Sequence, residues 1–307
     1  MNELATLIAE PWADYGLLDS GHGRKLERYG PYCFIRPEPQ ALWSPASADW
    51  QADGEFTGGA DEDGGGRWRL DTRVPASWEL SRGELKFRAS NTPFRHLGFF
   101  PDMAVHWDWM QSRLAAYKIA NAGPAPSVLN LFGYTGVGSL ACAAAGASVT
   151  HVDASKKAVI SAQDNQRLSK LDAAPIRWLV DDALKFMRRE VRRGKRYGGI
   201  ILDPPKYGRG PEGEVWELYA GLPELIALAR QLLTPDSAFL VLTVYAVRMS
   251  ALAIGGLLGE ALADLGGSIT AGEMAVREAS RDRLLPTAIF ARWQRDTGAL
   301  PGSGAAR

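Results

Sequence analysis

The segment ILDPPKYGRG, at positions 201–210, has residue types and a spacing suited to chemistry. An apolar run ends in an acid, and two successive prolines, a lysine and an aromatic residue follow it. Because proline fixes φ and lacks an N–H, the pair predicts a rigid extended turn whose carbonyl oxygens point outward without internal partners. Such a turn presents acceptors to a substrate, although a proline stop after a buried strand is the structural alternative. The candidate catalytic residues are Asp203, Pro204, Pro205, Lys206 and Tyr207.

A glycine-rich segment, NLFGYTGVGS at positions 130–139, follows another apolar run. Gly133, Gly136 and Gly138 allow positive φ and a close approach of a ligand, and the helix expected next offers unpaired N–H groups and a partial positive end. An anionic or adenosyl ligand suits such a loop. The spacing G-x-x-G-x-G differs from the G-x-G-x-x-G of dinucleotide folds, which argues against NAD. A tight strand–helix turn without a ligand is the alternative.

Acidic residues end the next two apolar runs. Asp153, seventeen residues after Gly136, is suited to accept both ribose hydroxyls of an adenosine ligand, or else to cap the next helix with Ser155. In the pair Asp181 and Asp182, one acid is expected to cap a helix and the other to accept from an adenine amino group. We favour Asp182 for the adenine.

From about Val105 onward, helix-length patterns alternate with short β runs, which indicates βαβ units and a mostly parallel sheet. Ligands of open α/β sheets bind at the carboxyl ends of the strands, where the segments above lie. The predicted strands are 128–131, 148–153, 176–180, 199–203 and 238–244, and the predicted helices are 107–118, 138–145, 158–168, 183–193, 215–233 and 251–265. Two last strands, near 268–276 and 288–294, leave no room for a crossover helix and should pair antiparallel.

The first 92 residues differ in composition from the rest of the chain. They are rich in Trp, Pro and Gly, with short strand-like pieces and almost no helical periodicity. The change of period predicts two domains. These are a small β-rich N-terminal domain at 1–92, which is a candidate for substrate binding, and a Rossmann-like α/β domain at 93–307.

Charge and cysteine content argue against several classes of protein. Thirty-five basic and 35 acidic side chains cancel, which counts against bulk nucleic-acid binding and leaves only a local patch for it. Cys33 and Cys142 form neither a zinc pattern nor a secreted disulfide framework, so we expect no metal site and a cytoplasmic setting. The N-terminus does not read as a signal peptide, and no run reaches the roughly 18 apolar residues of a membrane span.

Taken together, NLFGYTGVGS, VDAS, DDALKFM and LDPPKY resemble, in order and spacing, the S-adenosylmethionine motifs of class I methyltransferases. In detail they are similar to the bacterial large-subunit ribosomal RNA methyltransferases of the 5-methylcytosine and 7-methylguanine group. HLGFFPD, at positions 96–102, also resembles the segment before the first motif in that group. The resemblance covers roughly residues 94–245. It implies a class I methyltransferase fold, S-adenosylmethionine as cofactor and an RNA, ribosomal by resemblance, as substrate.

The resemblance also implies a role for each matching residue. The residues that it assigns to the cofactor are Phe99, Phe100, Asp102, Phe132, Gly133, Thr135, Gly136, Asp153, Ala154, Asp181, Asp182, Ala183 and Asp203. Among them, Asp153 would take the ribose, Asp182 the adenine, and Asp203 the methionine moiety beside the reactive centre.

One departure from the family pattern bears on the mechanism. Methylation at C5 of cytosine needs a thiolate that adds to C6, and in the resembling enzymes this cysteine follows a threonine at the end of the fifth strand. Positions 242–246 read LTVYA here, without a cysteine. Direct transfer to a base nitrogen is therefore favoured. Lys206 would meet a phosphate or base oxygen and Tyr207 would stack on a flipped base, unless the two are plain surface and packing residues.

Two basic segments are candidates for contact with the substrate. The run from Lys185 to Arg196 has helical spacing and is interpreted mainly as a solvated face, whereas REASRDR, at 277–283, is the better candidate. We expect a methyltransferase that acts on a base nitrogen in ribosomal RNA. Methylation of a protein or small molecule, or a non-catalytic cofactor-binding scaffold, is the alternative, and the oligomeric state, a homodimer included, stays open.

Overall fold

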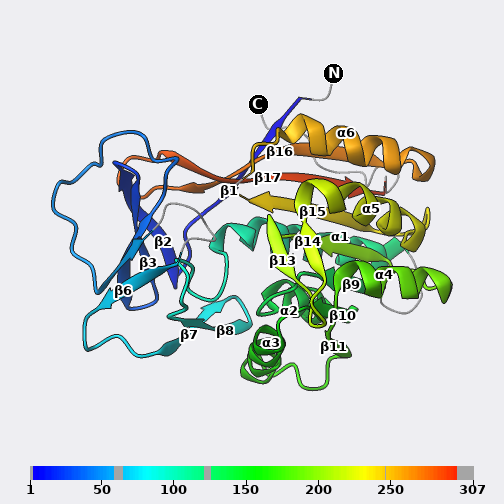
Figure 1. Cartoon of the computed structure of the whole chain (residues 1–307), viewed down its shortest axis with the longest axis horizontal. Coiled ribbons are helices and arrows are strands. Elements are labelled where there is room, and N and C mark those ends of the chain that lie inside the picture. Colours follow the sequence, from blue (N-terminus) through cyan, green and yellow to red (C-terminus); the bar gives the residue numbers. More distant parts are fainter. Residues whose placement is uncertain (1–2, 59–64, 121–125, 246, 296–307) are drawn as a thin grey trace.

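An eight-stranded sheet with the order β1-β16-β17-β15-β12-β9-β10-β11 forms the centre of the computed structural model (Figure 1). The structure describes residues 3–58, 65–120, 126–245 and 247–295. The strands of this sheet are β1 (Ala5–Ala9), β9 (Ser127–Leu131), β10 (Ser148–Asp153), β11 (Ile176–Val180), β12 (Gly199–Leu202), β15 (Phe239–Tyr245), β16 (Ser268–Arg277) and β17 (Leu284–Gln294). All neighbouring pairs are parallel except those that involve β17, which is antiparallel to β15 and β16. The predicted α/β class and the antiparallel last pair are confirmed.

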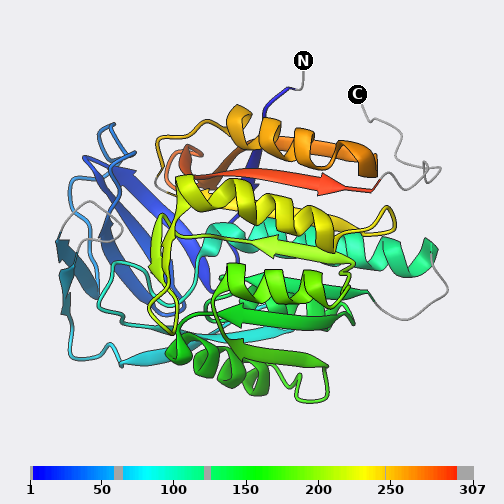
Figure 2. The ribbon, with the colours of Figure 1, turned by 45° about the vertical axis from the view of Figure 1, so that its right-hand side comes forward.

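Helices cover both faces of this sheet. They are α1 (Ala104–Ala120), α2 (Val137–Ala144), α3 (Lys156–Leu168), α4 (Ala183–Arg192), α5 (Leu218–Leu232) and α6 (Ala251–Ala261), with short 3-10 turns η1 (Pro101–Met103) and η2 (Ala263–Leu265). Helices α4, α5 and α6 run side by side across one face, in front of the strands in Figure 2. Because strand residues alternate between faces, Val128 and Val241 join the core beneath α1 and α2, whereas Leu129 and Leu240 join the core beneath α4 to α6.

Local capping residues set the helix ends near the predicted positions. The Ser155 hydroxyl accepts the Ala158 N–H at 3.2 Å at the start of α3, and Ser250 caps α6 in the same way. One predicted helix begins later than expected, because β13 (Tyr207–Arg209) and β14 (Val215–Glu217) form a hairpin before α5. The hairpin lies directly after the turn at Asp203, Pro204 and Pro205, which we call the DPP turn. The turn and the hairpin therefore form one continuous segment between β12 and α5.

The N-terminal part is rich in β-structure, as predicted. Strands β2 (Tyr15–Gly21), β3 (Arg24–Tyr29), β4 (Tyr32–Pro37), β5 (Gly54–Gly58) and β6 (Gly66–Leu70) form one sheet, and β7 (Ser77–Arg82) pairs with β8 (Leu85–Ser90). Figure 1 shows these strands at one end of the large sheet. The first strand, β1, instead pairs in parallel with β16, so residues 5–9 belong to the large sheet although they precede the N-terminal β-structure.

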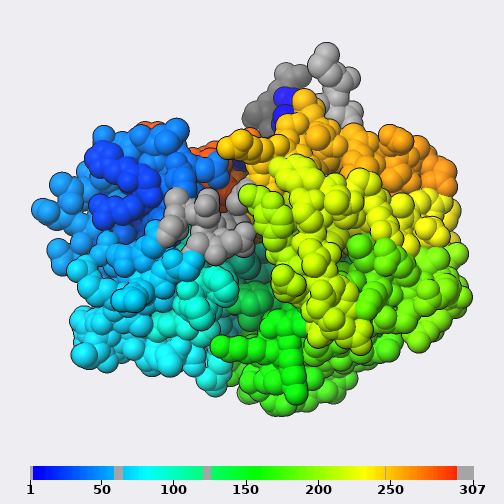
Figure 3. All heavy atoms as spheres, in the orientation of Figure 1, coloured from blue at the N-terminus to red at the C-terminus, as the bar shows by residue number. Residues whose placement is uncertain are grey.

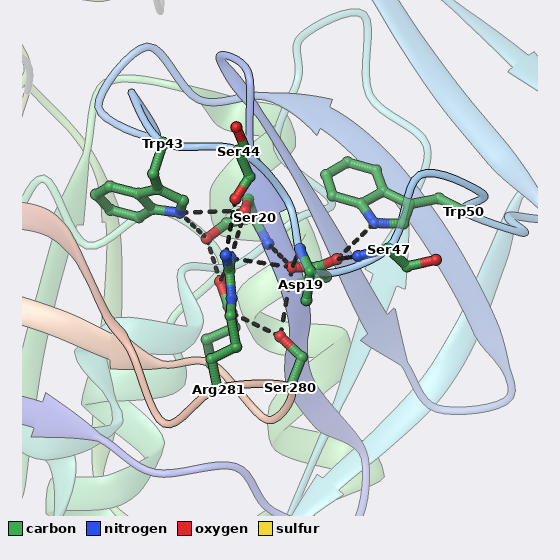
Figure 4. Close-up of polar contacts among 10 residues, drawn as sticks. Asp19, Ser20, Trp43, Ser44, Ser47, Trp50, Ser280 and Arg281 are labelled. Atoms are coloured by element: carbon green, nitrogen blue, oxygen red, sulfur yellow. Dashed lines mark hydrogen bonds and ion pairs between the residues drawn. The ribbon is translucent and has the colours of Figure 1, made fainter.

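A polar network joins β2 to the turn between β16 and β17 (Figure 4). Arg281 in this turn contacts Asp19 at 3.2 Å and Glu278 at 2.7 Å, and both carboxylates are buried. Asp19 also accepts the Trp50 indole N–H at 2.8 Å, and Ser20 donates to Glu278. This network, which we call the polar brace, fixes the N-terminal strands against the large sheet.

The polar brace changes the interpretation of the REASRDR segment. Arg281 is held within the chain, Arg277 pairs with Glu10 at 2.8 Å, and the Arg283 guanidinium lies 4.6 Å from the ring centroid of Trp43. These contacts are structural, so the segment is not the substrate-facing loop that its charge indicated. Sequence reasoning missed this because the partners Glu10, Asp19 and Trp43 lie more than 230 positions away from the arginines that they contact.

Candidate functional site

A cavity of about 1090 Å³ opens where the carboxyl ends of the large-sheet strands meet the N-terminal strands. Figure 3 shows the hollow between the blue and cyan N-terminal part and the green and yellow part of the molecule. From the predicted site residues, the cavity wall contains Phe99, Phe100, Asp102, Phe132, Asp153, Ala154, Asp181, Asp182, Ala183, Asp203, Pro204, Pro205 and Lys206. Segments that lie more than a hundred residues apart in the chain therefore share one wall.

The loop after β9 has an unusual backbone. Phe132, Tyr134 and Gly136 have φ angles of 56°, 47° and 81°, all in the left-handed region. Non-glycine residues rarely adopt this conformation, and it tends to persist at ligand sites where the surroundings hold it. Phe132 and Tyr134 line the cavity, so the strained backbone directs two aromatic side chains toward it.

Gly133, Thr135 and Gly136 are absent from the cavity wall, and their contacts are with the protein. A Cβ at Gly133 would come within 2.4 Å of the His151 ring, and one at Gly136 within 2.7 Å of the Ala162 side chain. The Thr135 hydroxyl donates to the Gly98 carbonyl at 2.7 Å. These three residues therefore shape the loop and tie it to the segment before α1.

Asp153, at the end of β10, lies on the cavity wall beside this loop. Its carboxylate accepts the N–H groups of Tyr134 and Ser155, each at 2.8 Å, and each contact uses a different oxygen. Burial raises the pKa of the carboxyl, although the two N–H donors act in the opposite direction. Ser155, not Asp153, caps α3, so the alternative role predicted for Asp153 is taken by its neighbour and lone pairs of both oxygens remain for a ligand.

The two acids after β11 divide their roles differently from the expectation. Asp182 caps α4 by accepting the Lys185 N–H at 2.9 Å, whereas Asp181 pairs with Arg189. We favoured Asp182 for the adenine, which left the helix cap to Asp181. The cap is on Asp182, so the predicted position of the cap is wrong. The cap uses only Oδ1 of Asp182, and both acids line the cavity.

The DPP turn also differs from the expected picture. Asp203 and Pro204 line the cavity, but the Pro205 carbonyl accepts the Trp216 indole N–H at 2.7 Å from β14. The prediction that both proline carbonyls lack internal partners is therefore wrong for Pro205. Tyr207 begins β13, is 53% exposed and lies outside the cavity wall, with Lys206 near its ring.

The segment before α1 closes the cavity from the other side. Phe99 is buried, and Phe100 packs against Tyr245 with 5.3 Å between ring centroids. Asp102 is 5% exposed, and among the described residues its Oδ2 has no hydrogen-bond partner. Burial raises the pKa of this carboxyl.

The cysteines lie away from the cavity. Cys142 is buried in α2, and burial raises the pKa of its thiol to about 12; burial also raises the pKa of Cys33, in β4. Neither side chain lines the cavity, and the chain contains only these two. Val244, which follows Thr243 where the thiolate of a C5-cytosine enzyme would be sought, lines the cavity, as does Tyr245. Ala246 lies outside the described residues.

Sequence reasoning missed the N-terminal side of the cavity. Five polar residues of β2, β3, β4 and the residue after β4 line it; they are Tyr15, Lys25, Glu27, Arg36 and Glu38. We call this surface the junction face. The available signal was the high content of charged residues in RKLERY, at positions 24–29, which a solvated strand edge would show as well.

The family model for S-adenosylmethionine-dependent methyltransferases matches residues 62–241, more than half of the chain. A methyltransferase of known structure from Agrobacterium tumefaciens, described as dependent on the same cofactor, is 44% identical. The match covers 96% of this chain and 97% of that one, with a TM-score of 0.89. The chain belongs to the S-adenosylmethionine-dependent methyltransferase family.

Curated relatives of this methyltransferase include ribosomal RNA enzymes. Ribosomal RNA large subunit methyltransferase I of Shewanella denitrificans is 36% identical over 115 residues, which is 37% of this chain and 29% of the relative. Methyltransferase K/L of Legionella pneumophila is 33% identical over 129 residues, 42% of this chain and 18% of the relative. The matched part thus spans less than a third of either relative.

The cavity wall of this methyltransferase fits the family's cofactor, S-adenosylmethionine, in chemical terms. Asp153 offers carboxylate oxygens for the ribose hydroxyls, and Phe132, Val152 and Ala183 offer apolar surface for a ring. Acidic groups also suit the positive charges that this cofactor carries on its sulfur and amino group. Within the described ranges, no helix is long and apolar enough to span a membrane.

Proposed function

We propose that the protein transfers a methyl group from S-adenosylmethionine to a base nitrogen in ribosomal RNA, without a covalent cysteine intermediate. The observation that carries the proposal is the cavity in which the strand-end acids, the DPP turn and the N-terminal strands meet, with both cysteines elsewhere. The names of the curated relatives support the RNA substrate. Because the wall offers no thiolate, the acceptor atom must itself be nucleophilic.

Three acids of the cavity wall would hold the cofactor. Asp153 would accept the ribose hydroxyls through the lone pairs that its two backbone contacts leave. Asp182 would accept from the adenine amino group through the oxygen that the helix cap does not use. Asp203 would lie beside the methionine moiety. Phe99, Phe100 and Asp102 would cover the cofactor from the opposite side, and Ala154, Asp181 and Ala183 would border the nucleoside.

When bound, S-adenosylmethionine supplies a methyl group that the positive charge on its sulfur already activates. The protein's task is therefore to align the acceptor and to exclude water. Asp203 and Pro204 would border the acceptor base, whereas Pro205 would act indirectly by anchoring the turn to Trp216. Lys206 would meet a base or phosphate oxygen, and the exposed Tyr207 would stack on a base at the mouth of the cavity. Residues 1–92, apart from β1, would form the substrate-binding part.

The decisive experiment compares modified nucleosides in ribosomal RNA from a deletion strain and its parent by mass spectrometry. The proposal expects one methylated nucleoside to disappear, and purified protein with labelled S-adenosylmethionine to restore it on RNA from the deletion strain. Identical nucleoside profiles, together with no methyl transfer to that RNA, would indicate that the acceptor is a protein or a small molecule. Cofactor binding without transfer to any acceptor would instead favour a scaffold.

A further inference from the structure

The N-terminal wall of the cavity consists of charged side chains where a β-sheet normally buries apolar ones. Along β3, Lys25, Glu27 and Tyr29 share one face, and Arg36 joins them from β4. Glu27 is 1% exposed, and Arg36 and Glu38 are 6% exposed. Burying so many charges is costly, and replacing buried ion pairs with apolar residues is often neutral or stabilising. Stability alone therefore does not account for this surface.

The junction face contains two ion pairs, one between Glu27 and Arg36 and one between Lys25 and Glu38. Glu27 accepts from Arg36 at 2.5 and 2.8 Å and from the Tyr15 hydroxyl at 2.8 Å. Arg36 also donates to the Arg95 carbonyl at 3.0 Å. Glu27 and Arg36 are thus occupied by each other and by their neighbours.

The second pair has hydrogen-bonding capacity to spare. Lys25 contacts Glu38 at 3.1 Å and Glu27 at 3.8 Å, which leaves one of its three N–H donors. Glu38 accepts from Lys25 on one oxygen and, at 3.4 Å, from the Gln40 N–H on the other, which leaves further lone pairs. A spare donor and a spare acceptor therefore lie side by side on the cavity wall.

The size of the cavity leaves room for this pair to meet a ligand of its own. At about 1090 Å³ it exceeds the roughly 300–1,000 Å³ of pockets for one small ligand. Asp153, Asp182 and Asp203, the acids proposed to hold the cofactor, occupy the strand-end side. Asp102, proposed to cover the cofactor, lies nearer the junction face, where burial raises its pKa and the charge of Lys25 acts in the opposite direction. An acceptor molecule beside the cofactor would therefore meet Lys25 and Glu38.

We propose that Lys25 and Glu38 form an acceptor subsite that binds the hydrogen-bonding edge of an uncharged nucleobase, while the phosphates of the RNA stay outside. A base edge carries an N–H donor next to an oxygen or nitrogen acceptor, which is the complement of this pair. Phosphate offers hydrogen-bond acceptors only, so it does not complement the acceptor oxygens of Glu38. The cavity wall also has eight Asp and Glu residues against five Lys and Arg, a balance of charge that disfavours an anion. The inference rests on the proposed function and specifies which residues recognise the base.

The first test is ligand-observed NMR with the complete protein and four probes, guanosine, adenosine, cytidine and uridine. At least one nucleoside is expected to show saturation transfer that inorganic phosphate does not displace. Lys25→Met and Glu38→Gln should each weaken this binding by roughly tenfold or more, the loss expected for a hydrogen bond to a charged group. The matched control is Arg69→Met, which breaks an exposed ion pair with Glu55 in the same N-terminal sheet, outside the cavity wall.

The second test separates this inference from the proposed function. With labelled S-adenosylmethionine and RNA from the deletion strain, the two variants should raise the KM for RNA while the cofactor Kd stays at the wild-type value. Each variant breaks the Lys25–Glu38 ion pair and should lower the unfolding temperature, so the assays are made at a temperature at which both variants remain folded. If the wild type transfers no methyl group to RNA, the proposed function fails. If it does transfer but binds no nucleoside, if phosphate displaces the bound nucleoside, or if the variants keep the wild-type KM, the subsite is wrong.

Discussion

The two sides of the cavity differ in how they are built. The strand-end side consists of short segments, each directly after a strand, in which an acid or a strained loop faces the ligand. The junction face consists largely of ion pairs that join neighbouring segments, held against the large sheet by the polar brace. One side is local in sequence and the other depends on contacts across the whole chain. Under the proposed roles, cofactor binding and acceptor binding would rest on separate kinds of structure, so mutations should separate them.

The largest expected effect is on the strand-end side. Asp153→Ala removes the carboxylate proposed for two ribose hydroxyls, and hydrogen bonds to charged groups contribute about 1.5–3 kcal/mol each. Isothermal titration should therefore show a Kd for S-adenosylmethionine at least about 100-fold higher than that of the wild type. Glu38→Gln is the control from the junction face and should leave this Kd unchanged. Undiminished cofactor binding by Asp153→Ala would contradict the separation of the two sides.

A second prediction concerns the brace that holds the junction face. Arg281→Gln leaves the buried Asp19 and Glu278 without their cation and should lower the free energy of unfolding by about 3 kcal/mol. Arg277 lies in the same turn, and its side chain is 29% exposed against 26% for Arg281, but its partners Glu10 and Asp282 are exposed. Arg277→Gln should therefore cost no more than about 1 kcal/mol. Urea titrations of the two variants measure the difference, and equal losses would show that burial of the carboxylates does not decide the outcome.

Most of the large sheet could be predicted from the sequence because its signals are local. The strands 148–153 and 176–180 were expected at their observed bounds, since apolar runs and capping residues such as Ser155 define them. The hairpin of β13 and β14 was missed because its strands are three residues long and the second reads like the start of the helix. The pairing of β1 with β16 was missed because nothing near residues 5–9 indicates a partner about 267 positions away.

The candidate site, like the fold, has features that the sequence predicts and features that depend on contacts between distant residues. Asp153 and Asp203 were found because a strand end is recognisable in the sequence and ligands gather there. The use of the Pro205 carbonyl by Trp216 and the cap at Asp182 depend on geometry that residue types do not reveal. The junction face was missed because Glu38 is buried and Lys25 half-buried only where the N-terminal strands pack against the large sheet. Charged strand residues are otherwise read as solvated.

The smallest expected difference between the two sides is their response to acid. Burial lowers the pKa of His151, under the glycine loop, to about 3; burial with the charges of Arg36 and Arg95 lowers the pKa of His96 to about 4. Each pKa lies below the unfolded value of about 6.5, so the unfolded state takes up the proton first and stability is lost as pH falls through that range. Each histidine should account for about 1 kcal/mol of loss between pH 7 and 5.5.

Asparagine variants at the two positions isolate these contributions. His151→Asn and His96→Asn should each flatten the pH dependence of the unfolding free energy, measured by urea titration at both pH values. Salt should change neither contribution much, because burial is the main cause of both low pKa values and Arg36, one of the two arginines that act on His96, is itself buried. A wild-type pH slope in His151→Asn would mean that the imidazole under the loop is solvated and that the strained loop is open to water.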